Sequence, residues 1–358
     1  MTRAGTGENV RKFLFFFLLL TAARPAVARV ASPPLWDRWL QTLPWPHDWD
    51  QAFESLERWT REAAPVAWAN QQRQRGLLID QAIDPRRPLV VLIHGLDGNA
   101  DCCRPMTRLL QQAGWQTAIF CYPADKHLSG NAQLLAEHLG ALREVYPDLK
   151  IDLVTQSMGG LVARQYVEGP QYAGGVDRLI LIAPPNAGSS WARFSWASKL
   201  VAHWQRYHRD PQWSAAWMIT EGLCQAGCDL KPGSRFLLEL NSHPRRAGVK
   251  YTIIAGDLPA GDRVGAELIE ASARLACGRW PQTWGPRQLN ATAQYWAEAL
   301  REERGRGDGP VSLASAALAG VDDLVIVHAD HLCLYESVDG RPPAAWPIVQ
   351  DRLADHGR

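Results

Sequence analysis

Short apolar strands that alternate with helical stretches are the feature that most constrains this chain. From Pro88 onward, unbroken apolar runs are separated by segments with apolar residues at helical spacing. Strands that are apolar on both faces need cover on both sides, which parallel sheets obtain from helices. We therefore predict an α/β fold with a mostly parallel central sheet and helices on both faces. The expected strands lie at 88–94, 116–122, 151–155, 178–183, 250–255 and 323–328, with helices at 107–113, 131–146 and 159–167.

The remaining segments divide the chain into parts. Residues 29–84 are rich in tryptophan, and we interpret them as an N-terminal extension that packs onto the main core, the alternative being a binding surface. The main α/β domain is expected at 85–358. Two stretches interrupt its alternation of strands and helices, a Trp-rich insertion at about 190–246 and a helical insertion at about 258–307.

The charge composition argues against one large class of function. The 358 residues include 38 Lys and Arg and 37 Asp and Glu, which gives a net charge of +1. Nucleic-acid binding depends on a concentrated basic face. We therefore expect no nucleic-acid partner.

The N-terminus has the pattern of an export signal. Arg11 and Lys12 precede the apolar run 13–23, and Ala26-Val27-Ala28 follows as a small-x-small cleavage site. The run has about a dozen residues, fewer than the ~20 that a membrane-spanning helix needs. We expect residues 1–28 to be a cleaved signal peptide and the mature protein to be periplasmic or secreted. The alternative is an uncleaved N-terminal membrane anchor.

Seven cysteines bear on that expectation, since an exported protein meets an oxidising compartment in which some should pair. Cys224 and Cys228 are close enough in sequence for a local disulfide, and Cys121 could meet Cys102 or Cys103. The odd count leaves at least one cysteine outside such pairs. A zinc site is the alternative, but the spacing lacks the paired CxxC pattern, so we expect no metal.

The strongest chemical signal is Val154-Thr155-Gln156-Ser157-Met158-Gly159-Gly160, which follows a predicted strand and opens a helix. That context is the one required of the nucleophile elbow G-x-S-x-G, and it predicts Ser157 as a nucleophile. The Met158 N–H at the helix N-terminus would face a developing oxyanion. Gly159 would let the helix pack close to the strand. Thr155 replaces the first glycine of the pattern, which is a departure from it.

A second motif, Ile93-His94-Gly95-Leu96, ends the first predicted strand. A flexible backbone at Gly95 would let the Leu96 N–H face the same point as the Met158 N–H, as a second oxyanion donor. His94 is expected to hold this loop by hydrogen bonding. In isolation the motif also fits a plain strand-to-loop turn, but the two motifs in this order, with a strand and a helix between them, favour an active site.

A serine nucleophile needs a base and an acid later in the chain. His331, just past the last predicted strand, is the expected base, and His328 is its rival at the strand end. Asp308, in a Gly-rich turn, is the expected acid that orients the imidazole. Its rivals, Asp257 and Asp262, lie closer to the end of the preceding strand.

Together these motifs resemble those of the bacterial lipases and lipase-like esterases of the α/β-hydrolase superfamily, which have inositol-deacylase-like relatives. The resemblance spans about 88–335. It is carried by Ile-His-Gly, Thr-Gln-Ser-Met-Gly-Gly, Ala-Pro-Pro-Asn-Ala-Gly-Ser at 183–189, Asp-Gly-Pro-Val, Asp-His-Leu and the segment 231–241.

The resemblance implies a catalytic triad of Ser157, Asp308 and His331 and a mobile lid over about 190–246. The calcium site of some lipases has no clear match here, so no cofactor is expected.

The predicted activity is hydrolysis of carboxylic esters through an acyl-Ser157 intermediate. The aromatic lid favours apolar acyl chains, from a small-molecule or lipid ester, with contact at a membrane surface or lipid interface. A thioesterase or an acyltransferase would use the same triad. The competing class is a non-catalytic hydrolase-like protein that binds a lipid or a partner.

Overall fold

The computed structural model describes six stretches of the chain, all within one compact unit, Phe53–Arg358: residues 75–96, 100–124, 126–189, 225–258, 307–338 and 340–355. The predicted signal peptide, nearly all of the Trp-rich extension, and residues 190–224 and 259–306 of the predicted insertions lie outside the described residues. No helix within the described stretches is long and apolar enough to cross a membrane.

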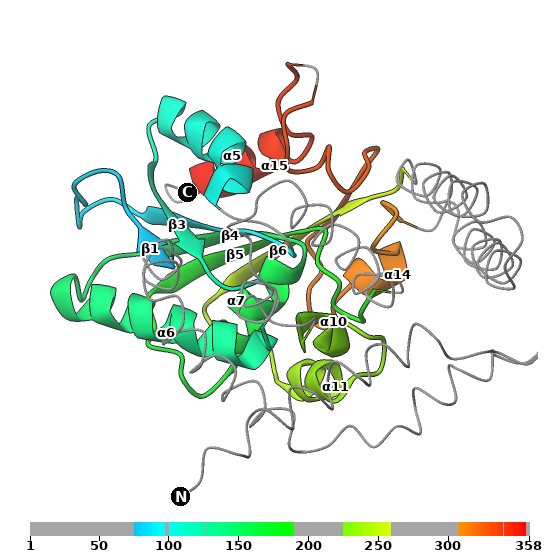
Figure 1. The fold of residues 1–358 in the computed structure, drawn as a ribbon. Helices are drawn as coiled ribbons and strands as arrows, with labels where there is room; N and C mark the ends of the chain where they lie inside the picture. Colours follow the sequence, from blue (N-terminus) through cyan, green and yellow to red (C-terminus); the bar gives the residue numbers. More distant parts are fainter. Residues whose placement is uncertain are drawn as a thin grey trace, which may run out of the picture. The chain divides into compact units, whose positions relative to one another are not determined.

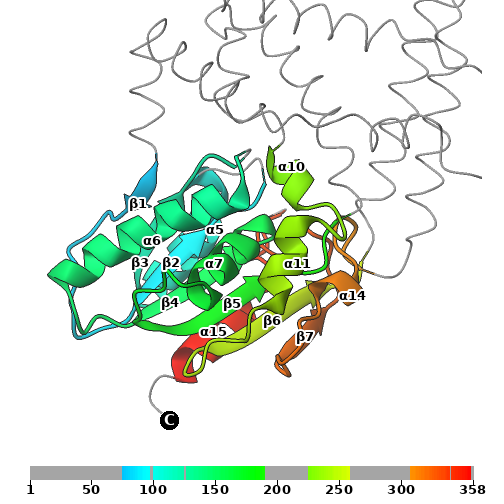
Figure 2. The ribbon, with the colours of Figure 1, turned by 90° about the horizontal axis from the view of Figure 1, so that it is seen from below.

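A seven-stranded sheet forms the centre of the described structure, with strand order β1-β3-β2-β4-β5-β6-β7. β1 pairs antiparallel with β3 at one edge, and every other neighbouring pair is parallel. Figure 2 shows the strands side by side in this order. The predicted mostly parallel sheet is thus confirmed. The strands are β1 (Gly76–Leu78), β2 (Leu89–Ile93), β3 (Gln116–Cys121), β4 (Ile151–Gln156), β5 (Val176–Ile182), β6 (Lys250–Gly256) and β7 (Leu324–Val327).

Helices cover both faces of this sheet. α5 and α15 lie on one face, whereas α6, α7 and α11 lie on the other (Figure 1). The described helices are α5 (Ala100–Gln112), α6 (Leu128–Val145), α7 (Met158–Glu168), α10 (Gln225–Asp229), α11 (Arg235–Ser242), α14 (Leu313–Ala316) and α15 (Trp346–Ala354). α5 begins at Ala100 and includes Pro105, so the predicted helix at 107–113 corresponds only to its second half.

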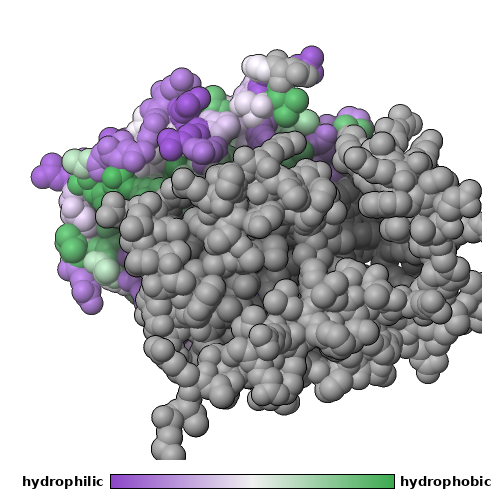
Figure 3. All heavy atoms as spheres, in the orientation of Figure 1, coloured by the Kyte–Doolittle hydropathy of each residue, from purple (hydrophilic) through white to green (hydrophobic). Residues whose placement is uncertain are grey.

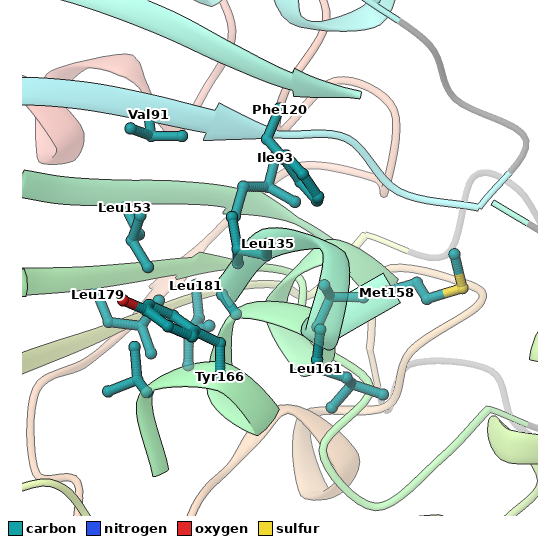
Figure 4. Packing of buried hydrophobic residues seen from close by; sticks show 14 of the residues in the cluster. Val91, Ile93, Phe120, Leu135, Leu153, Met158, Leu161, Tyr166, Leu179 and Leu181 are labelled. Carbon is teal, nitrogen blue, oxygen red and sulfur yellow. The ribbon is translucent and has the colours of Figure 1, made fainter. Parts of the chain in front are cut away.

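Successive residues of the central strands point into two separate cores. In β2, Val91 and Ile93 pack with α6 and α7, while Val90 and Leu92 pack with α5 and α15. Figure 4 shows the first core, in which Leu135, Leu161 and Tyr166 lie with the strand residues Val91, Ile93, Phe120, Leu153, Leu179 and Leu181. Successive side chains of a strand point to opposite faces of the sheet. Because helices cover both faces here, β2 is apolar at every position.

The outer side of α5 contrasts with this interior. Its residues Asp101, Arg104 and Arg108 are exposed, while Met106 and Leu110 are buried. Hydrophilic side chains predominate in Figure 3 over the region of α5. α5 is therefore an amphipathic outer helix whose apolar stripe covers the sheet.

Two features differ from the boundaries expected from sequence. β1 belongs to the sheet although it lies inside 29–84, the segment interpreted as an extension. α11 lies inside the predicted lid, but its residues Leu237 and Leu240 are buried in the core beside α7. The stretch 235–242 is therefore part of the domain body, because its apolar face packs against α7.

The expected disulfides are not formed. Cys102, Cys103, Cys121 and Cys228 are free thiols, which corrects both proposed pairings. Cys103 packs in the apolar core beneath α5, and burial raises the pKa of its thiol to about 12. Burial likewise raises the pKa of Cys121 to about 11. These two side chains therefore act as small apolar residues of the interior.

Candidate active site

The parallel strands bring the sequence motifs to one edge of the sheet. β2 ends at Ile93 and leads into His94, β4 ends at Gln156 and leads into Ser157, and β7 ends at Val327. In open parallel sheets this carboxyl edge is where ligands bind. The motifs singled out from the sequence thus share the edge on which such folds build their sites.

Ser157 occupies a strained turn between β4 and α7. It is the N-cap of α7, with φ 48° and ψ −123°, one of two non-glycine residues at positive φ in the described chain. Its N–H donates to the carbonyl oxygen of Ile182 at 2.7 Å. A non-glycine residue in this region costs about 1–3 kcal/mol and is typical of functional sites. The backbone is the one expected of a nucleophile elbow.

Thr155 fits although it departs from the glycine of the usual pattern. It is the penultimate residue of β4 and fully buried. Its hydroxyl donates to the carbonyl oxygen of Ile180 in the neighbouring β5 at 3.2 Å. The hydroxyl therefore has a partner, and the β-branched side chain lies within a regular strand, where such residues are favoured.

Glycines allow α7 to approach the end of β2. A Cβ on Gly159 would lie 2.4 Å from the carbonyl oxygen of His94 and 2.8 Å from that of Ile93. A Cβ on Gly95 would lie 3.2 Å from the Cβ of Ser157. The predicted oxyanion loop and the nucleophile turn are therefore in direct contact, and Leu96, half-buried, follows at once. The Met158 N–H, in the first turn of α7, has no carbonyl partner within the helix.

His94 and Tyr122 hold the backbone of this loop. The two rings stack with centroids 4.2 Å apart and planes 5° apart. The Tyr122 hydroxyl donates to the carbonyl oxygen of His94 at 2.6 Å. His94 Nδ1 donates to the carbonyl oxygen of Gly95 at 3.0 Å, and its Nε2 accepts from the Tyr122 N–H at 3.3 Å.

These bonds require a neutral imidazole, with one nitrogen as donor and the other as acceptor. Burial lowers the pKa of His94 to about 4, which keeps the ring neutral near pH 7. The loop-holding contacts expected for His94 are therefore present. Tyr122 was missed in the sequence, where it is only the last residue of a predicted strand.

Asp308 and His331 form a buried pair beyond the ends of β6 and β7. Asp308 Oδ2 accepts from His331 Nδ1 at 2.8 Å, and the His331 N–H donates to the carbonyl oxygen of Asp308 at 3.1 Å. Asp308 Oδ1 accepts from the Val311 N–H at 3.0 Å. The side chains are 1% and 14% exposed. A carboxylate on Nδ1 fixes the tautomer in which Nε2 is available to accept a proton.

The rival residues pair with each other instead. His328 Nδ1 and Asp257 Oδ1 are 2.8 Å apart, but these side chains are 77% and 39% exposed. Water competes with such an exposed pair, which orients an imidazole less firmly than a buried one does. Asp262 lies outside the described residues. No group of three metal-ligating side chains converges within the described stretches.

The sheet order, the helices on both faces and the strained serine turn at the carboxyl edge define an α/β-hydrolase fold. The mature form of the Bacillus licheniformis lipase BlEst2 matches with a TM-score of 0.51 at 19% identity, over 77% of this chain and 97% of the lipase. Its propeptide form matches with a TM-score of 0.50 at 19% identity, over 77% of this chain and 52% of that one. Lipase 1 of Pelosinus fermentans gives 0.46 at 14% identity, over 75% and 98% of the two chains.

The sequence of this chain matches known families over a shorter stretch than its fold matches the lipase. A family model described as a domain of unknown function, DUF7379, matches residues 56–225. That range contains Leu96 and Ser157 but neither Asp308 nor His331. A search of curated proteins finds no match.

Proposed function

We propose that this protein is a serine carboxylic-ester hydrolase that acts through an acyl-Ser157 intermediate, with His331 as base and Asp308 as orienting acid. The observation that carries the proposal is the buried Asp308–His331 pair, 2.8 Å apart, on the sheet edge where Ser157 occupies a strained turn. The nucleophile, the base and the acid that acyl transfer requires thereby each have a candidate from a different loop.

In the first half-reaction His331 Nε2 takes the proton of the Ser157 hydroxyl while Ser157 Oγ attacks the ester carbonyl carbon. The carbonyl π bond opens and its electron pair goes to the oxygen, which the N–H groups of Leu96 and Met158 stabilise. When the tetrahedral intermediate collapses, the bond to the alkoxy oxygen breaks. His331 returns its proton to that oxygen and the alcohol leaves.

In the second half-reaction water replaces the alcohol. His331 takes a proton from the water as its oxygen attacks the acyl carbon, and the same two N–H groups bind the oxyanion. The bond to Ser157 Oγ then breaks, the serine regains its proton from His331, and the carboxylic acid departs. Asp308 stays ionised throughout and stabilises the imidazolium formed in each half-reaction.

Apolar acyl esters are the proposed substrates. Leu332, next to the base, is 57% exposed, and Leu96 of the oxyanion loop is half-buried. The Trp-rich composition of the predicted lid, 190–246, is the further reason for proposing an apolar acyl chain. The lipases of similar fold support an ester as the bond that is cleaved.

The test compares the wild-type protein with Ser157→Ala and with Ser242→Ala, an exposed serine at the end of α11. Each protein is treated with a fluorophosphonate probe and assayed on p-nitrophenyl esters of short and long acyl chains, with detergent present. We expect labelling and turnover in the wild type and in Ser242→Ala and neither in Ser157→Ala. Turnover that survives in Ser157→Ala, or a wild type that neither labels nor turns over, would refute the proposal. The chain-length profile separates an esterase from a lipase.

A further inference from the structure

A buried ionic cluster lies on the nucleophile helix, away from the proposed reacting groups. The Arg164 side chain is completely buried. Its Nε and Nη2 donate to the two carboxylate oxygens of Glu168 at 3.0 and 3.1 Å. Arg245 Nη1 donates to the same carboxylate at 2.7 Å. Two guanidinium groups thus share one carboxylate, and the cluster has one excess positive charge.

Arg164 Nη1, the third nitrogen of that guanidinium, donates to two asparagine side chains. Arg164 Nη1 donates to Asn186 Oδ1 at 2.9 Å and to Asn241 Oδ1 at 3.0 Å. Asn186 is 1% exposed, whereas Asn241 is an exposed residue of α11. The Asn241 amide also donates to the Asn186 carbonyl oxygen at 2.8 Å. Asn186 therefore lies against the nucleophile helix through a charge-assisted hydrogen bond, which is among the stronger kinds.

The other side of Asn186 faces the segment that follows the Asp308 turn. Its Nδ2 donates to the carbonyl oxygen of Ala316 in α14 at 2.7 Å. Neighbouring residues of the same loop add parallel bonds: the Ala187 N–H donates to the carbonyl oxygen of Ser315 at 3.1 Å, and the Ser189 hydroxyl donates to that of Pro310 at 2.6 Å. Pro310 is two residues after Asp308. One loop therefore bonds both the nucleophile helix and the acid turn.

We propose that Asn186 is a positioning residue that couples the helix carrying Ser157 to α14, the helix that follows the turn carrying Asp308. Its amide accepts on the helix side and donates on the acid side, and a carboxamide is the side-chain group that does both in one plane. Its loss leaves the Ala316 carbonyl oxygen without this buried partner and lets α14, and with it the acid turn, shift against the remaining bonds of Ala187 and Ser189. This inference rests on the proposed function, since it concerns the geometry of the same triad.

The critical variant is Asn186→Asp. The aspartate has the same shape, keeps an acceptor for Arg164 and neutralises the excess positive charge of the cluster. It loses the donor to Ala316 and sets a carboxylate oxygen against that carbonyl. The link to the nucleophile helix thus remains while the side-chain link to α14 is cut. Asn186→Ala removes both links. Asn241→Ala is the control, because it removes one bond to Arg164 and one to the Asn186 backbone but leaves the Asn186 side chain with both of its partners.

The readouts separate positioning from stability. For each variant we measure kcat and KM on the ester that the wild type hydrolyses best, the melting temperature, and the low-field proton NMR signal of His331 Nδ1–H, assigned with His331→Ala. We expect Asn186→Asp and Asn186→Ala to lower kcat by about 10- to 100-fold with KM within about two-fold, because a misplacement of about 1 Å costs up to ~10²-fold. The low-field signal should shift or broaden in both variants, while Asn241→Ala keeps wild-type kcat and signal.

Wild-type kcat and an unchanged His331 signal in folded Asn186→Asp would overturn the inference, and so would an equal loss of kcat in Asn241→Ala. Failure of the proposed function is a distinct result. In that case the wild type does not turn over any ester, and the His331 signal alone decides whether Asn186 positions the Asp308–His331 pair.

Discussion

Substitution of Gly159 by alanine tests the close approach on which the proposed oxyanion hole depends. The new Cβ would lie 2.4 Å from the carbonyl oxygen of His94 and 2.8 Å from that of Ile93. Ordinary carbon–oxygen contacts are about 3.3–3.6 Å, so the start of α7 must move from the end of β2 by about 1 Å. Both obstructing atoms are backbone atoms, which cannot rotate away as a side chain would.

Two consequences follow from that displacement. Overpacking of this kind costs about 1–3 kcal/mol of folding free energy. A shift of about 1 Å also separates the Met158 N–H from the Leu96 N–H, and misplacement on that scale lowers kcat by up to ~10²-fold, or about 2.7 kcal/mol. KM should change much less, because the loss falls on the oxyanion, which exists only in the transition state and the intermediates.

Two other glycines provide controls for this variant. A Cβ on Gly160 would lie 3.0 Å from Leu181 Cδ2, 3.2 Å from Thr155 Oγ1 and 3.3 Å from Pro184 Cβ. These are side-chain atoms at longer distances than the backbone oxygens at Gly159, so Gly160→Ala should cost less in both kcat and stability. A Cβ on Gly140 in α6 would meet nothing within 4 Å, and alanine there should add about 0.5–1 kcal/mol of stability with unchanged kcat. The assays are ester turnover and thermal unfolding. Wild-type kcat in Gly159→Ala would refute the reasoning.

Two further predictions concern the titratable groups. Asp308→Asn should lower kcat by roughly 10³–10⁴-fold in ester turnover, because the amide no longer fixes the tautomer in which His331 acts as a base. Asp257→Asn, which changes the exposed pair with His328, should leave kcat nearly unchanged. Equal losses of kcat in the two variants would contradict the assignment of Asp308 as the orienting acid. The pKa of His94 falls from 6.5 to about 4 on folding, so the unfolded chain binds more protons between these values and stability should fall by about 3 kcal/mol as pH drops through that window. Urea unfolding at several pH values checks this, and a His94→Gln variant with the same pH slope as the wild type would contradict it.

The architecture could be predicted from the sequence because its strongest signals are local. The run at 89–93 is apolar throughout, which predicts a central parallel strand, and 151–156 contains Ile151, Leu153 and Val154 just before the serine motif. β1 was missed because it is only three residues long and is stabilised by pairing with β3, far along the chain. α11 was assigned to a lid because its amphipathic pattern does not reveal which surface it covers.

The site was predictable to different degrees for a related reason. Ser157 lies in a motif whose spacing follows from the turn itself, so the sequence identifies it directly. Asp308 lies in a glycine-containing turn and Asp257 follows the end of a strand, so the sequence offers both as the acid. Only tertiary contacts distinguish them, because each carboxylate lies 2.8 Å from a different histidine. The Asp308–His331 pair is far less exposed than the Asp257–His328 pair. The sequence does not predict this difference, because the burial of a loop residue depends on what packs over it.

Asn186 illustrates the kind of residue that sequence reasoning passes over. It lies in the Ala-Pro-Pro-Asn-Ala-Gly-Ser segment, which supported a family resemblance without revealing a role. Its partners lie 22 residues before it, on Arg164, and 130 residues after it, on Ala316. No periodic pattern encodes such a bond. The three proposed triad residues come from two parts of the chain separated by more than half of the domain, so a polar side chain that bonds both parts links the fold directly to the proposed chemistry.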